Sequence, residues 1–189
     1  MMQNLKSKSV VIRLNGSINN STINLLMTTI DNKMSEGVRD FVLLLSSHGG
    51  DTAAGLTGYN YLRGLPVKIT TCNIGTVSSI ATVLYCTGER RISVPHAKFL
   101  IHEPYWSFQE SKLDEGEIDE ILKRLAIYKQ NIAKVIAINT GKTILEVLDT
   151  MRQRTTFTPD EALSWGLIHE INSELFEEHS EVISINRES

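Results

Sequence analysis

The chain has 189 residues, of which 41% are hydrophobic and 22% are charged, and its formal net charge is -3. These values fit one domain of ordinary size with a buried core, and the slight negative charge argues against a nucleic-acid partner. No apolar run is long enough to span a membrane, and no apolar segment follows the lysines near the N-terminus. We therefore expect neither a membrane span nor a secretory signal.

The two cysteines, Cys72 and Cys86, lie outside any cluster with metal-ligand spacing. This pattern predicts free, buried thiols in a cytoplasmic protein that carries no metal. No Gly-x-x-x-x-Gly-Lys-Ser/Thr phosphate loop is present either, so we expect no nucleotide and no other cofactor.

In the first half of the chain, β-branched and apolar runs alternate with segments of helical character. The predicted strands cover residues 10–14, 41–45, 67–71, 90–94 and 98–101. The predicted helices cover about 20–34, 53–62, and a segment that begins at Ser78-Ser79 and ends at Gly88. The continuous apolar run at 41–45 is typical of a strand with both sheet faces covered.

In the second half, apolar residues recur at helical spacing from Ile118 to Ile136, which predicts one long helix. Two shorter helices are expected at about 143–151 and 158–165, followed by a strand at 167–171 and a frayed polar tail from about residue 177. Repeated βα units predict a single α/β domain over residues 1–189 with a largely parallel sheet.

Gly49-Gly50, Ser78-Ser79 and His102 all fall at or just after the ends of predicted strands, where open α/β sheets build their sites. A serine at a helix start is either an N-cap or a nucleophile beside free backbone N–H groups. In the second case, the N–H groups of Gly49-Gly50 and Ile80 are candidate oxyanion donors, and His102 is a candidate base. The Gly-x-Ser-x-Gly elbow of α/β-hydrolases is absent around Ser79.

The order of these segments is informative. The chain reads Ser46-Ser-x-Gly-Gly-Asp51, then Gly75-x-x-x-Ser79, then Phe99-Leu-Ile-His-x-Pro104, with Asp160-Glu-Ala-Leu-Ser-Trp-Gly-Leu-Ile168 near the end. This series, from about residue 10 to about residue 170, resembles the Clp protease proteolytic-subunit family of serine peptidases.

The resemblance implies a role for each candidate residue. It implies Ser79, rather than Ser78, as the nucleophile and His102 as the general base. It also implies an oxyanion hole at Gly49, Gly50 and Ile80. The implied fold is a crotonase-like spiral of βαβ units with a protruding handle helix.

The resemblance further implies a homo-oligomeric ring, or stacked rings, that hydrolyses peptides or unfolded polypeptides. The apolar stripe from Ile118 to Ile136 would then contact a neighbouring subunit, although the periodicity also fits a helix in the core of its own chain.

Two features depart from the family pattern. Arg154 stands where the family has the aspartate of its triad. Three outcomes stay open: a Ser-His dyad, a carboxylate such as Glu103 or Asp149 from elsewhere, or a weakened or inactive enzyme. The first strand also begins near Val10, without the longer N-terminal segment through which processive members contact an unfoldase ATPase, which puts that partner in doubt.

Two rival functions follow. One is a non-catalytic ring subunit that binds peptides, for which Arg154 is the main evidence. The other is a crotonase-type acyl-CoA enzyme, which shares the spiral fold and a backbone oxyanion hole but does not need a Ser/His pair.

Overall fold

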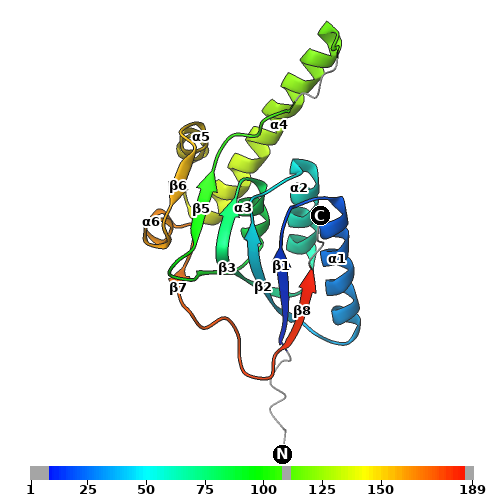
Figure 1. Cartoon of the computed structure of the whole chain (residues 1–189), viewed down its shortest axis with the longest axis vertical. Helices are drawn as coiled ribbons and strands as arrows, with labels where there is room; N and C mark the ends of the chain where they lie inside the picture. The colour runs from blue at the N-terminus through cyan, green and yellow to red at the C-terminus, as the bar shows by residue number, and fades with distance from the viewer. Residues whose placement is uncertain (1–8, 108–111, 186–189) are drawn as a thin grey trace, which may run out of the picture.

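The computed structural model describes residues 9–107 and 112–185, and the described strands form one eight-stranded sheet (Figure 1). The N-terminal lysines, which bear on the expected absence of a secretory signal, and residues 186–189 of the polar tail lie outside the described residues. The strands are β1 (Ser9–Asn15), β2 (Asp40–Ser47), β3 (Lys68–Ser78), β4 (Arg90–Ser93), β5 (Lys98–Ile101), β6 (Thr155–Phe157), β7 (Glu170–Ile171) and β8 (Glu181–Ile185).

Every strand pairing in the described sheet is parallel except that of β5 with β6. The helices are α1 (Asn20–Ser35), α2 (Thr52–Gly64), α3 (Ile80–Tyr85), α4 (Glu115–Thr140), α5 (Ile144–Arg152) and α6 (Pro159–Trp165). This mostly parallel sheet with a long helix confirms the expected α/β spiral with a handle.

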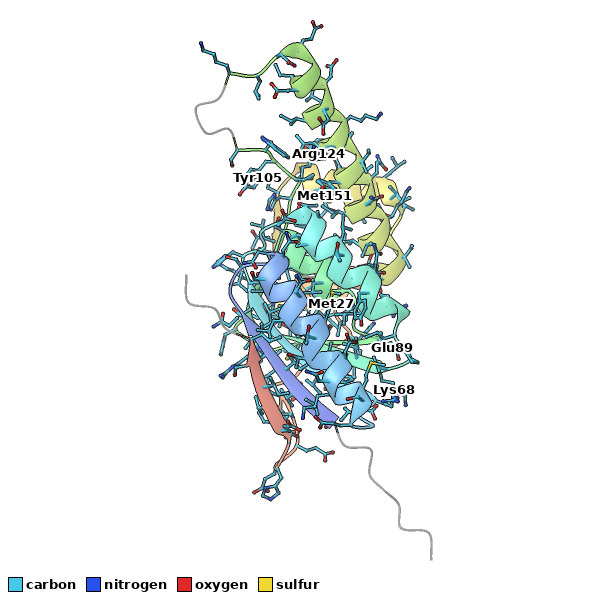
Figure 2. The ribbon with its side chains drawn as sticks, turned by 90° about the vertical axis from the view of Figure 1, so that its right-hand side faces the viewer. Met27, Lys68, Glu89, Tyr105, Arg124 and Met151 are labelled. Carbon is cyan, nitrogen blue, oxygen red and sulfur yellow. The ribbon has the colours of Figure 1, made fainter. Side chains whose placement is uncertain are left out.

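The two faces of the sheet bury different side chains. Val10, Ile12 and Leu14 of β1 belong to the main core, on the side where α1 and α2 pack against the sheet (Figure 2). Val11, which points the opposite way because side chains alternate along a strand, belongs to a smaller cluster against which Leu175 packs. Burial on both faces explains why the strands read as nearly continuous apolar runs.

A change of partner along β3 sets the position of the candidate site. The first part of β3 pairs with β4, up to Asn73, and the last part pairs with β5, from Thr76 to Ser78. Between them, the Asn73 side chain donates to the Lys98 carbonyl at 2.9 Å and accepts from the Gly75 N–H at 3.0 Å. The first of these bonds joins β3 to the start of β5, and the second fixes the backbone of β3 where its partner changes.

Helix α4 projects beyond the body of the molecule (Figure 1). Asp114 and Glu117 form a capping box at its start, which satisfies backbone N–H groups in a first turn that no other element covers. Only Ile132, Ala133, Ile136 and Ala137 are buried within this chain, whereas Ile118, Leu122, Ile127 and Ile138 are exposed. The expectation of a core helix within the chain therefore holds only for its last turns.

The structure corrects three expectations about strands. The polar tail from about residue 177 was expected to be frayed, but its residues 181–185 form β8, which pairs in parallel with β1. The strand expected at 67–71 continues to Ser78, and the strand expected at 167–171 is limited to Glu170–Ile171.

Candidate active site

Ser79 lies at a sharp junction between β3 and α3. Its backbone has φ 57° and ψ -132°, a conformation that costs a non-glycine residue roughly 1–3 kcal/mol. The Ser79 N–H donates to the Leu100 carbonyl at 2.8 Å, and its carbonyl accepts from the Thr82 N–H at 3.0 Å. Hydrogen bonds on both sides of the residue hold it in this strained conformation.

The Ser79 side chain does not act as a helix cap. It makes no capping hydrogen bond to α3, so the N-cap alternative is wrong for this serine. Ser78, by contrast, is the last residue of β3 and is buried, with 4% of its surface exposed. Of the two serines, Ser79 is the more exposed, and its hydroxyl makes no capping hydrogen bond.

The Gly49-Gly50 turn lies directly against Ser79. A Cβ atom added to Gly49 would be 2.7 Å from the Ser79 Cβ and 3.3 Å from its Oγ, so only glycine fits there. The turn is fixed, because the Gly49 carbonyl accepts from the Ile18 N–H at 2.9 Å and its N–H donates to the Ser47 Oγ at 3.1 Å.

The candidate oxyanion donors differ in whether their N–H groups already donate a hydrogen bond. The Gly49 N–H is bound to Ser47, whereas among the described residues neither the Gly50 N–H nor the Ile80 N–H donates to another element or to a side chain. Ile80 is the first residue of α3, where backbone N–H groups lack partners within the helix. The N–H groups of Gly50 and Ile80 could therefore donate to a substrate oxygen without losing an existing hydrogen bond.

His102 follows β5, next to the end of β3, and is 8% exposed. Its Nδ1 lies 2.7 Å from the main-chain oxygen of Glu103. Because a carbonyl can only accept, the Nδ1 must carry the hydrogen, and the Nε2 of the neutral ring is then the free acceptor. The ring of Tyr105 stacks on that of His102 at a centroid distance of 5.9 Å. A free Nε2 is what a general base requires.

No hydrogen bond joins the Ser79 hydroxyl to the His102 ring among the described residues. Catalytic hydrogen bonds are often long before substrate binds, so this geometry does not exclude the pair. The paired register of β3 and β5, with Ser78 opposite Leu100, places both residues at the same edge of the sheet.

Arg154 lies just before β6, the strand that pairs with β5. Strand β6 runs antiparallel to β5 with Thr155 opposite Ile101, and Arg154 is the residue that precedes Thr155. Arg154 has φ 52° and an exposed side chain at the turn that follows α5. The residue predicted to stand in place of the family's aspartate thus precedes the strand that neighbours β5, and its side chain carries a positive charge.

The two carboxylates that the sequence left open are bound elsewhere. Asp149 accepts a hydrogen bond from Gln153 at 2.6 Å, and the Glu103 carboxylate lies 3.4 Å from the ammonium of Lys129 on α4. Neither contacts the His102 ring among the described residues. Within residues 9–107 and 112–185, the acceptor for the His102 Nδ1 is the Glu103 carbonyl.

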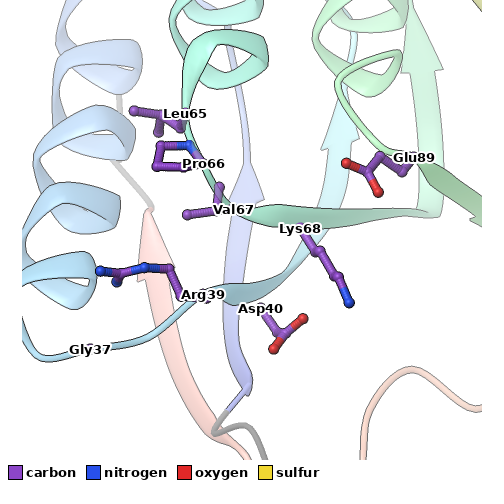
Figure 3. Close-up of a pocket in the computed structure, with 8 residues that line it drawn as sticks. All are labelled: Gly37, Arg39, Asp40, Leu65, Pro66, Val67, Lys68 and Glu89. Carbon is purple, nitrogen blue, oxygen red and sulfur yellow. The ribbon is translucent and has the colours of Figure 1, made fainter.

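Figure 3 shows a separate pocket at the opposite end of the strands, lined at the starts of β2 and β3 by charged side chains that include Arg39, Asp40 and Lys68. Because β2 and β3 end near Gly49 and Ser79, this pocket is not part of the site. The described residues contain no group of three or more His, Cys, Asp or Glu side chains that could hold a metal ion. No helix among them is both long and apolar enough to cross a membrane.

Comparison with known proteins identifies the family of the chain. The family model described as Clp protease matches residues 1–174. The chain belongs to the Clp protease family. This confirms the resemblance that the order of motifs predicts.

Curated relatives of this Clp protease family member are distant. It is 27% identical over 150 residues to the ATP-dependent Clp protease proteolytic subunit of Oryza sativa subsp. japonica, covering 77% of this chain and 68% of the relative. It is 29% identical over 141 residues to the ATP-dependent Clp protease proteolytic subunit 3 of Rhodococcus jostii, covering 74% and 68%. At such identity, the roles of individual residues rest on the geometry of the site.

Sequence reasoning missed one component of the site in this Clp protease family member. The acceptor for His102 is a main-chain oxygen, which has no residue-type signal. The dipeptide Glu103-Pro104 is the one signal in the sequence that bears on this carbonyl, because a residue before proline is confined to extended conformations.

Proposed function

We propose that this chain is a cytoplasmic serine endopeptidase that hydrolyses peptides or unfolded polypeptides through an acyl-enzyme. The observation that carries the proposal is the strained, uncapped Ser79 packed against the Gly49 turn. A backbone conformation of this cost persists only where the surrounding structure enforces it, which is typical of functional sites.

In the proposed reaction, the Ser79 Oγ attacks the scissile carbonyl carbon and its proton passes to the Nε2 of His102. The N–H groups of Ile80 and of the Gly49-Gly50 turn, chiefly Gly50, stabilise the oxyanion. The imidazolium then gives its proton to the leaving amine, and a water molecule, activated by the same Nε2, releases the acyl group from Ser79.

Assembly into a ring is part of the proposal. The relatives are named as proteolytic subunits, and the exposed Ile118 and Leu122, one turn apart on α4, offer an apolar surface that a neighbouring subunit would bury. Those names also include ATP dependence. Any such dependence here would belong to a separate ATPase, since the sequence contains no phosphate-binding loop.

A fluorophosphonate probe that reacts with activated serines tests the proposal. We expect stoichiometric labelling that Ser79→Ala abolishes and Ser78→Ala retains. Intact oligomers without labelling, measured with light scattering, would favour a non-catalytic subunit. Binding of acyl-CoA without labelling would favour the crotonase-type alternative.

Arg154 favours the non-catalytic alternative, and its substitution separates a weak enzyme from an inactive one. In a Ser-His-Asp triad the aspartate stabilises the imidazolium, and Arg154→Asp would supply such a carboxylate. We expect Arg154→Asp to raise the rate of Ser79 labelling by at least about tenfold. Labelling that is absent in both proteins would contradict the peptidase proposal, and an unchanged rate would show that Arg154 does not act on His102.

A further inference from the structure

The segment that follows His102 is fastened to α4 at two points. The Glu103 carboxylate lies 3.4 Å from the Lys129 Nζ, and the Arg124 guanidinium lies 5.2 Å from the centroid of the Trp106 ring. Figure 2 shows Tyr105 and Arg124 in this region, beside α4. The long helix is therefore in direct contact with the residues that follow the candidate base.

Glu103 joins that helix to the base through two different groups. Its main-chain carbonyl accepts the His102 Nδ1–H at 2.7 Å, while its side chain pairs with Lys129. Pro104 restricts the Glu103 backbone to extended conformations, so the direction of this carbonyl is limited to a narrow range. An anchored side chain and a restricted backbone together fix where the carbonyl points.

We propose that Lys129 of α4 is a positioning residue for His102: by holding the Glu103 side chain, it aims the Glu103 carbonyl that keeps the imidazole in its Nδ1–H tautomer. The carbonyl thus does the orienting work that an aspartate does in a Ser-His-Asp triad. This inference rests on the proposed peptidase function when its effect is measured as labelling of Ser79, but not when it is measured as the tautomer of His102.

The ion pair has little to contribute as a stabilising contact. Both side chains are more than a third exposed, at 38% for Lys129 and 39% for Glu103, and pairs of this kind contribute little to folding. A role in orientation therefore predicts that loss of Lys129 changes the site without changing the stability of the protein.

The test compares Lys129→Met with Lys134→Met, which removes an equal charge from an exposed position on the same helix. We expect Lys129→Met to lower the rate of Ser79 labelling by about fivefold, with the thermal midpoint unchanged. Lys134→Met should label like the wild type. Lys129→Arg should restore the wild-type rate, because it restores the cation.

A second measurement does not depend on activity. The ring-nitrogen ¹⁵N chemical shifts of His102 distinguish the two tautomers, so wild type and Lys134→Met should show Nδ1–H, and Lys129→Met should show a mixture with Nε2–H. The double variant Glu103→Lys/Lys129→Glu should recover Nδ1–H by reversing the pair.

Each failure has a separate meaning. If Lys129→Met keeps both the wild-type labelling rate and a pure Nδ1–H tautomer, the positioning role is wrong. An equal loss in Lys134→Met would also overturn it. If the wild type is not labelled at all, the peptidase proposal fails, and the tautomer of His102 in Lys129→Met still decides the role of Lys129.

Discussion

At the scale of single residues, the strained conformation of Ser79 is set by its backbone hydrogen bonds rather than by a local sequence motif. The elbow sequence Gly-x-Ser-x-Gly is absent, yet Ser79 still has φ 57°, which the hydrogen bonds to Leu100 and Thr82 impose. The small residue that the close packing requires is supplied by Gly49, which lies far from Ser79 in the sequence. Contacts between distant segments have replaced the glycines that usually flank such a serine.

Gly49→Ala tests this dependence. Its φ of 99° is unfavourable for alanine, and the new Cβ would be 2.7 Å from the Ser79 Cβ. We expect the free energy of unfolding in urea to fall by about 3 kcal/mol, and labelling of Ser79 to fall at least about tenfold as Ser79 is displaced.

Gly37→Ala is the matched control for that variant. Gly37 has a similar φ of 91°, but a Cβ there would meet nothing within 4 Å. It should cost about 1 kcal/mol through backbone strain alone and leave labelling unchanged. Equal effects of the two substitutions would show that the contact with Ser79 is unimportant.

At the scale of elements, a buried arginine joins β4 to the C-terminal ends of three helices. Arg91 is 4% exposed, and its guanidinium donates to the carbonyls of Leu167 at 2.7 Å, Gly88 at 3.2 Å and Asn139 at 2.6 Å. These carbonyls come from the turn after α3, the last turn of α4 and the segment after α6. Arg91 therefore ties the base of the handle helix to the sheet.

We expect Arg91→Met to lower the free energy of unfolding by about 3 kcal/mol, because the buried carbonyls lose their donors. Arg90→Met is the control, since Arg90 is exposed and pairs with Glu170 on the surface. It should cost at most about 1 kcal/mol. Urea unfolding measures both, and equal losses would show that the buried hydrogen bonds add no stability.

At the scale of the whole molecule, the two free cysteines lie in the two clusters on opposite faces of the sheet. Cys72 belongs to the smaller cluster and Cys86 to the main core. Burial raises the pKa of each thiol to about 12, although the charge of Arg91 opposes the rise at Cys86. Between about pH 9 and pH 12, folding thus keeps both thiols protonated, whereas the same thiols in an unfolded chain would ionise.

The protein should therefore lose stability at alkaline pH. The thiol contribution is complete below about pH 9, the ordinary pKa, and declines as pH rises towards about 12, because only the unfolded state releases the protons. The slope is at most about 1.4 kcal/mol per pH unit for each thiol. Urea midpoints between pH 8 and pH 11 should fall less steeply in Cys72→Ala/Cys86→Ala, and an equally steep fall would contradict this account.

Local signals predicted the elements that depend on local interactions. Asn19, Asp114, Thr143 and Thr158 each cap a helix, and these helices begin within a few residues of where their polar and apolar patterns place them. The order of Gly49-Gly50, Ser79 and His102 likewise predicted which residues meet at one edge, because the carboxyl ends of parallel strands lie together.

Strands that depend on distant partners were not predictable in this way. β6 has three residues and β8 lies in a polar tail, so neither carries a clear alternation, and both form because β5 and β1 offer free edges. The expected strand at 167–171 is shortened because the Leu167 N–H is taken by the Ala162 carbonyl at the end of α6.

The sequence by itself determined the family, the α/β class, the long helix and the candidates Ser79 and His102, because these features follow from residue types and their spacing along the chain. Tertiary structure decided that Ser79 is strained and uncapped, that Gly49 packs against it, and that the Glu103 carbonyl accepts a hydrogen bond from the His102 ring. These features involve backbone groups and pairing between distant segments, which no local pattern encodes.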